Sequence, residues 1–203
     1  MNNLFRIFKN RIDVSLFDDI KKTVYDYSET DFCRFSDSDY KGCFPSKNNS
    51  IENYYPGLMA KIKDSMFGDC SADFLKDGKF EIYFVKGAKA PPNLTMLKHK
   101  DLVRLHAINM CIYGADGAEI GFYKSKSGSR ARILDDSDAE LIATAPIVND
   151  EIMLLNVQEY HAITDQHMQS GKDMFILSYD WNPAVHCYRW DKLVKILEDE
   201  NLI

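Results

Sequence analysis

The stretch "LKHKDLVRLHAINMCIYG", residues 97–114, joins two metal-binding side chains to a long apolar segment. His99 and Asp101 are two residues apart, and side chains at that spacing on a strand point to the same face. Residues 104–114 have the composition of a strand that ends at a glycine. The stretch therefore predicts two neighbouring metal ligands at the start of a sheet. The alternative is a surface pair in a turn, since a His-x-Asp pair also arises by chance.

The composition is that of a globular protein and excludes some functions. The chain has 203 residues and a net charge of −6, which argues against a general nucleic-acid binder, because such a protein needs a basic face. It has no apolar segment of the roughly 18 residues that a membrane span requires. The five cysteines show no CxxC spacing, which favours reduced thiols in the cytoplasm. We expect a single domain over residues 1–203.

The first part of the chain, residues 1–78, reads as mainly helical. Apolar residues follow helical spacing in 16–27, and again in 55–67, where a glycine then ends the pattern. Between them, residues 29–53 are rich in polar residues and glycine and predict a long loop. The C-terminal segment, 183–203, should contain a helix near 189–200.

The central part, residues 79–182, has the pattern of an all-β core. Turn residues recur about every ten positions between short segments rich in β-branched and aromatic residues, which is typical of a sandwich or barrel. The predicted strands are 80–86, 94–101, 104–114, 119–125, 145–150, 151–157, 161–165 and 173–181, with a polar loop at 126–138. The fold class is therefore mainly β with flanking helices: a cupin-like jelly roll against which the N-terminal helices pack.

His161 in "LLNVQEYHAITD" is the best candidate for a third ligand. It follows another strand-like segment, far enough along the chain for the sheet to return across a barrel. Two histidines and one carboxylate on one side of an ion leave its other positions open. That facial arrangement suits non-haem Fe(II).

These segments resemble the Fe(II)- and 2-oxoglutarate-dependent oxygenases, whose core is a double-stranded β-helix, and in particular the prolyl 4-hydroxylase type. The resemblance covers about residues 80–181, with "KHKDLVRLHAINMCIYG" similar to the family's HxD segment and "APIVNDEIMLLNVQEYHAITD" to its approach to the distal histidine. It implies a triad of His99, Asp101 and His161 and a dependence on Fe(II), 2-oxoglutarate and O2. It further implies that oxidation of a substrate C–H bond is coupled to decarboxylation of 2-oxoglutarate.

The resemblance also implies a site for 2-oxoglutarate. Where the family usually has an arginine for the far carboxylate, this chain offers Lys172, with Arg104 as the second candidate. Ser178 would share a strand face with Lys172 and assist it, and Asn109 matches an asparagine of the small enzymes. A lysine differs from arginine because it is a point-charge donor without the planar fork.

Two tyrosines, the other histidines and two loops complete the set of residues considered. Tyr113 would line the pocket and bond the co-substrate, as would Tyr123, although both also fit as packing aromatics. The other histidines, His106, His167 and His186, read as structural or exposed residues. Loops 29–53 and 126–138 are candidate substrate lids.

Two other functions remain open at this stage. One is a cupin-like metalloenzyme that does not use 2-oxoglutarate, which would usually carry three histidines or a glutamate. The other is a non-catalytic jelly-roll binding module. Small molecules and peptidyl residues are both compatible with the sequence as substrates, and no oligomeric state is predicted.

Overall fold

The structure is a computed structural model. It describes residues 3–11, 13–18, 33–34, 41–44, 56–68, 70–75, 78–85, 97–101, 104–164, 174–181 and 184–203. Two antiparallel β-sheets and two α-helices make up most of this part of the chain. Within it, no helix is both long enough and apolar enough to cross a membrane.

The larger sheet has seven strands. Its order is β1 (Phe5–Arg11), β10 (Glu151–Leu155), β6 (Ala107–Tyr113), β12 (Met174–Asp180), β4 (Lys79–Val85), β3 (Lys41–Phe44) and β2 (Cys33–Arg34). Strand β6 pairs with β10 on one side and with β12 on the other, and both of these strands come later in the chain. In the pairing of β12 with β6, Ser178 is opposite Asn109. Strands distant in sequence therefore alternate in this sheet, as they do in a jelly roll.

The smaller sheet has five strands. Its order is β8 (Ile133–Leu134), β5 (Lys98–His99), β11 (Tyr160–Ile163), β7 (Glu119–Ser125) and β9 (Ala139–Pro146). Strand β5 has only two residues and lies between β8 and β11. The segment with the HxD motif is thus an inner strand of the smaller sheet.

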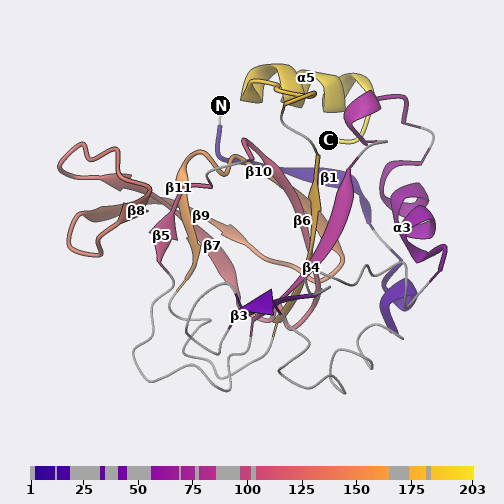
Figure 1. Cartoon of the computed structure of the whole chain (residues 1–203), viewed down its shortest axis with the longest axis horizontal. Helices are drawn as coiled ribbons and strands as arrows, with labels where there is room; N and C mark the ends of the chain where they lie inside the picture. The colour runs from indigo at the N-terminus through magenta and orange to yellow at the C-terminus, as the bar shows by residue number, and fades with distance from the viewer. Residues whose placement is uncertain are drawn as a thin grey trace.

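The helices cover the outer face of the larger sheet. Helix α3 (Leu58–Phe67) and helix α5 (Trp190–Asp199) lie on one side of it, and the smaller sheet lies on the other (Figure 1). Helix α5 buries Leu193, Val194 and Leu197, whose spacing puts them on one face. The molecule therefore has three layers, namely helices, larger sheet and smaller sheet.

Alternation along the strands divides the core in two. In β12, Phe175, Leu177 and Tyr179 pack toward the helices, whereas Met174 and Ile176 pack between the sheets. Successive side chains on a strand point to opposite faces, so Ser178 also points between the sheets, where it is fully buried. The space between the sheets consequently holds a polar side chain among apolar ones.

The fold class predicted from the sequence is confirmed. The strands expected at 80–86, 104–114, 119–125, 151–157, 161–165 and 173–181 correspond to β4, β6, β7, β10, β11 and β12, and the helices expected at 55–67 and 189–200 to α3 and α5. Helix α3 packs against the larger sheet, as expected of an N-terminal helix.

Other predictions need correction. Strand β1 was not expected in the N-terminal part, and β2 and β3 lie within residues 29–53, for which a loop was predicted. These short or charged segments become strands because β10 and β4 offer them a sheet edge. Strand β9 occupies 139–146, whereas a strand was predicted at 145–150. Residues 19–32, most of the helix expected at 16–27, lie outside the described part.

Candidate metal centre

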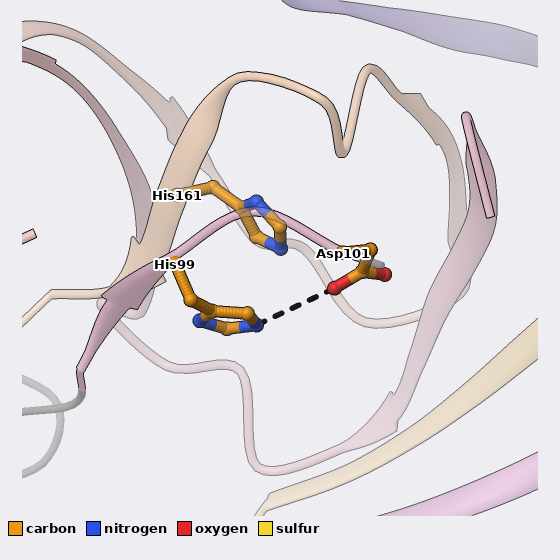
Figure 2. A group of neighbouring side chains, drawn as sticks. All are labelled: His99, Asp101 and His161. Carbon is orange, nitrogen blue, oxygen red and sulfur yellow. Dashed lines mark ion pairs between the residues drawn. The ribbon is translucent and has the colours of Figure 1, made fainter. Parts of the chain in front are cut away.

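Pairing of β5 with β11 brings two predicted ligands side by side. His99 and His161 are direct partners in this antiparallel pair. Directly opposed side chains lie on the same face of a sheet, and the centres of the two imidazole rings are 4.6 Å apart. Asp101 follows β5 and turns its carboxylate toward the rings (Figure 2). The three residues predicted as a triad thus form one cluster.

Each imidazole is oriented by a backbone carbonyl two residues earlier. His99 Nδ1 lies 2.8 Å from the Leu97 carbonyl oxygen, and His161 Nδ1 lies 3.0 Å from that of Glu159. A carbonyl oxygen can only accept a hydrogen bond, so each Nδ1 carries the proton and donates it. This leaves the lone pair on Nε2, and His99 Nε2 is 3.5 Å from Asp101 Oδ1. Histidines that bind metals are commonly oriented in this way.

The electrostatics favour a charged carboxylate beside a neutral imidazole. Burial raises the pKa of Asp101, but a protonated His99 ring, which would donate to Oδ1, and the charge of Arg104 outweigh it and hold the pKa below the usual value. Burial, and repulsion from the neighbouring His99 ring whenever that ring is protonated, lower the pKa of His161 to about 4. At neutral pH, Asp101 is therefore an anion and His161 has a lone pair available for a cation.

The donor atoms fit a single divalent cation. One ligand atom from each of the three residues lies within 4.8 Å of the other two. Two donors that are each about 2.1 Å from one ion are at most about 4.2 Å apart, so small side-chain rotations would close the difference. Imidazole nitrogens and a carboxylate oxygen suit iron and its neighbours in the first transition row.

The backbone carbonyls of Asp101 and Arg104 are held by Gln158, a residue that no sequence motif marked. The Gln158 side-chain amide donates to the carbonyl oxygens of Asp101 at 3.1 Å and of Arg104 at 2.9 Å. The Asp101 N–H donates to the Val157 carbonyl oxygen at 2.9 Å. A glutamine in a turn has no sequence signature for this role, because the role depends on contacts with residues more than 50 positions away in the chain.

Three of the predicted co-substrate residues form a chain that begins at Asp101. Arg104 contacts both Asp101 and Ser178, and Ser178 contacts Asn109. Tyr113 is not part of this chain: it lies four residues beyond Asn109 on β6, roughly 13 Å along the strand, and packs against Phe175. Lys172 lies outside the described residues.

The neighbouring lysines and loop lie on the other face of β5. Lys98 pairs with Asp136 at 2.6 Å and also lies over the Tyr123 ring, while Lys100 lies over the Tyr160 ring. Tyr123 is thus a packing partner on this outer face. The segment 126–138, predicted as a loop, contains β8 and runs beside the histidine cluster because β8 pairs with β5. Most of the other candidate lid, 29–53, lies outside the described residues.

The other histidines lie apart from the cluster in sequence and in their contacts. His106 is buried, has its Nε2 2.9 Å from the Tyr188 carbonyl oxygen and packs against Trp190 of α5. His186 stacks on Tyr188. His167 lies outside the described residues. The first two thus have packing contacts, in keeping with the structural role inferred from the sequence.

No family model and no curated protein matches this sequence. Among solved structures, apo HygX from Streptomyces hygroscopicus aligns with 89% of this chain and 82% of its own at 9% identity, with a TM-score of 0.52. HygX with nickel and 2-oxoglutarate bound aligns with 86% and 81% at 9% identity and a TM-score of 0.51. SnoN, the non-heme alpha-ketoglutarate-dependent epimerase from nogalamycin biosynthesis, aligns with 88% and 78% at 8% identity and a TM-score of 0.50.

At this level of identity the likeness is one of fold. The matched regions extend over more than two thirds of both chains in each comparison, so they include the sheets and not a single motif. The chain therefore shares its mainly β, jelly-roll fold with HygX and SnoN, and it carries a His-Asp-His cluster on and next to strands β5 and β11 of the smaller sheet.

Proposed function

We propose that the protein is an Fe(II)- and 2-oxoglutarate-dependent oxygenase that hydroxylates its substrate. The observation that carries this proposal is the orientation of the cluster: both histidines have Nδ1 tied to a carbonyl, and their Nε2 atoms are available beside the Asp101 carboxylate. The proposed metal ligands are His99, Asp101 and His161. Three ligands on one side of an ion leave the opposite positions for other molecules.

Each residue of the cluster would have a defined task. His99 and His161 present neutral nitrogen donors, and their carbonyl partners keep the rings from turning away. Asp101 contributes the negative charge that offsets part of the charge of the cation. When bound, Fe(II) with 2-oxoglutarate supplies O2-dependent C–H oxidation, in which 2-oxoglutarate becomes succinate and CO2. The protein's part is to set the geometry and to limit access of water.

A pocket between the sheets is the proposed site for the chain of 2-oxoglutarate. Asn109 lies on its wall with apolar neighbours that include Cys111, Met153 and Ile176. Its amide nitrogen has no acceptor among the described residues and could donate to a carboxylate. The one charged residue described at the wall is Glu151, so the cation for the far carboxylate must come from elsewhere. We propose Lys172 for this role. Ser178 would assist through Asn109, because its hydroxyl proton is donated to Asn109 Oδ1.

The neighbours favour a small-molecule substrate over a peptidyl one. A third HygX structure holds nickel, 2-oxoglutarate and hygromycin B, at a TM-score of 0.50 and 8% identity. The name of SnoN, in contrast, is that of an epimerase. Both reactions begin at a C–H bond, so the product decides between them: hydroxylation adds one oxygen atom to the substrate, and epimerisation adds none.

The cupin-like alternative without 2-oxoglutarate has less support. Such enzymes usually carry three histidines or a glutamate, whereas this cluster has two histidines and an aspartate. The non-catalytic alternative is disfavoured because all three ligand positions hold residues that can bind a metal, oriented for binding. Neither alternative predicts that 2-oxoglutarate would be consumed.

The proposal predicts a visible absorption band in an anaerobic titration. Addition of Fe(II) and then 2-oxoglutarate should produce the weak charge-transfer band of the chelated co-substrate, and admission of air should yield succinate. Zn(II) in place of Fe(II) is the control, since it can occupy the same ligands but gives neither the band nor succinate. Absence of both signals in the Fe(II) sample would contradict the proposed function.

A lysine substitution tests the co-substrate site. Lys172→Ala should raise the KM for 2-oxoglutarate by roughly 10–100-fold, because a hydrogen bond to a charged group contributes about 1.5–3 kcal/mol. Its Fe(II) affinity should stay close to that of the wild type. Lys195→Ala is the matched control, since that exposed lysine pairs with Asp199 on helix α5. An unchanged KM in Lys172→Ala would remove Lys172 from the site.

A further inference from the structure

Arg104 makes side-chain contacts with Asp101 and Ser178 that have no role in the proposed function as stated above. Its Nε donates to Asp101 Oδ2, and its Nη1 donates to Ser178 Oγ at 2.9 Å. The Asp101 and Arg104 side chains are mostly buried, with 12% and 23% of their surface exposed. Burial limits access of water and salt, so this ion pair is screened less than an exposed one. The guanidinium therefore holds one named oxygen of the candidate ligand.

The residue that Arg104 contacts through Nη1, Ser178, is itself held in place. Ser178 is fully buried, and its hydroxyl donates to Asn109 Oδ1 at 2.7 Å. That bond uses the single hydroxyl proton, so a lone pair of Oγ is turned to Arg104. Ser178 and Asn109 are also opposed in the register of β12 and β6. Arg104 thus links the carboxylate after β5, in the smaller sheet, to two residues of the larger sheet.

The backbone of each of the two residues is also bonded to Gln158. The Gln158 side-chain amide donates to the carbonyl oxygens of Asp101 and Arg104. Both residues therefore have a backbone contact that is independent of the pairing of their side chains.

We propose that Arg104 is a positioning residue that makes Asp101 a ligand through Oδ1 alone. With Oδ2 engaged by Arg104, Oδ1 is the oxygen beside His99 Nε2, at 3.5 Å. A carboxylate bound through both oxygens would take two of the six positions of an octahedral ion. With the two histidines, only two positions would remain, and a chelating co-substrate fills both. Attachment through Oδ1 alone leaves three, one more than the co-substrate needs.

This inference rests on the proposed metal centre and is tested with metal alone. Mn(II) affinity is measured by anaerobic calorimetry, and the number of Mn(II)-bound waters by proton relaxation, for wild type, Arg104→Gln and Arg104→Lys. Arg104→Gln should bind Mn(II) about 10–100-fold more weakly, as is usual when an outer partner of a ligand is lost. It should also hold fewer waters, because Oδ2 can replace one.

Two comparisons separate positioning from a loss of folding. Arg104→Lys should recover most of the affinity and the water count, since an ammonium can still hold Oδ2. Arg189→Gln makes the same substitution at a largely exposed arginine, 3.7 Å from Asp191, and should match the wild type. If Arg104→Gln does not fold, Ser178→Ala decides. A folded Ser178→Ala protein should bind Mn(II) more weakly and hold fewer waters than the wild type, and wild-type values for both quantities overturn the inference.

The remaining outcomes also decide. Arg104→Gln with wild-type affinity and wild-type water count overturns the inference and leaves the proposed function intact. A variant that keeps Mn(II) but loses affinity for 2-oxoglutarate would make Arg104 the co-substrate anchor and not a positioning residue. A wild-type protein that binds neither Mn(II) nor Fe(II) overturns the proposed function, and this inference with it.

Discussion

Replacing His99 with alanine will abolish formation of succinate from 2-oxoglutarate and weaken Fe(II) binding by more than the roughly 10–100-fold that loss of an outer partner costs. The substitution removes one of three donor atoms, and its Nε2 is the donor beside Asp101 Oδ1. Two ligands cannot impose a facial arrangement, so the ion that remains would be poorly held. Fe(II) affinity by anaerobic titration and succinate yield in air measure the two effects.

A matched histidine controls for the substitution itself. His186→Ala removes an imidazole that stacks on Tyr188 beyond the larger sheet, away from the cluster. It should leave Fe(II) affinity and succinate yield near those of the wild type. Normal Fe(II) binding by a folded His99→Ala protein would show that the cluster is not the iron site, whatever the activity.

Replacing Phe122 with alanine will give the largest loss of stability among the changes considered, about 3–5 kcal/mol. Phe122 is fully buried between the sheets, is the register partner of His161, and stacks on Phe5 of β1 with ring centres 6.0 Å apart. Its removal would leave a cavity beside a candidate ligand. Fe(II) affinity should therefore fall together with the free energy of unfolding, measured by denaturant titration.

Two further variants calibrate that result. Phe122→Leu keeps most of the apolar volume and should cost much less. Ile142→Ala alters an aliphatic residue of β9 that is 45% exposed, and surface changes of this kind usually stay within about 0.5 kcal/mol. A Phe122→Ala loss no greater than that of Ile142→Ala would mean that Phe122 does not support the core as described.

The three candidate metal ligands could be predicted from the sequence, whereas the contacts of the residues around them could not. The spacing of His99 and Asp101 and the strand before His161 depend on local pattern, and the structure brings these three residues together. The contact of Arg104 with Ser178 joins positions 74 residues apart, and no local pattern encodes it. Arg104 was noticed in the sequence because it lies near the motif, but as a candidate for binding 2-oxoglutarate. Its bond to Asp101 became apparent only in the structure.

The errors in the fold have the same origin. Strand β1 has the sequence "FRIFKNR", and its charged residues give it little strand character until β10 provides an edge. Strand β3 contains a glycine and lies in a polar region, and it forms as a partner of β4. Strand β9 carries exposed residues at most of its positions, so it lacks the apolar alternation that reveals a half-buried strand.

The shortness of β5 has a thermodynamic consequence. This strand has two residues, so few ladder hydrogen bonds tie it to β11, yet each of the two strands carries a candidate ligand. A cation bound by the ligands of both strands would therefore crosslink two segments that are far apart in the chain. Because an ion that binds only the folded form stabilises it by mass action, the free-metal concentration in the cell would set how stably β5 stays paired with β11.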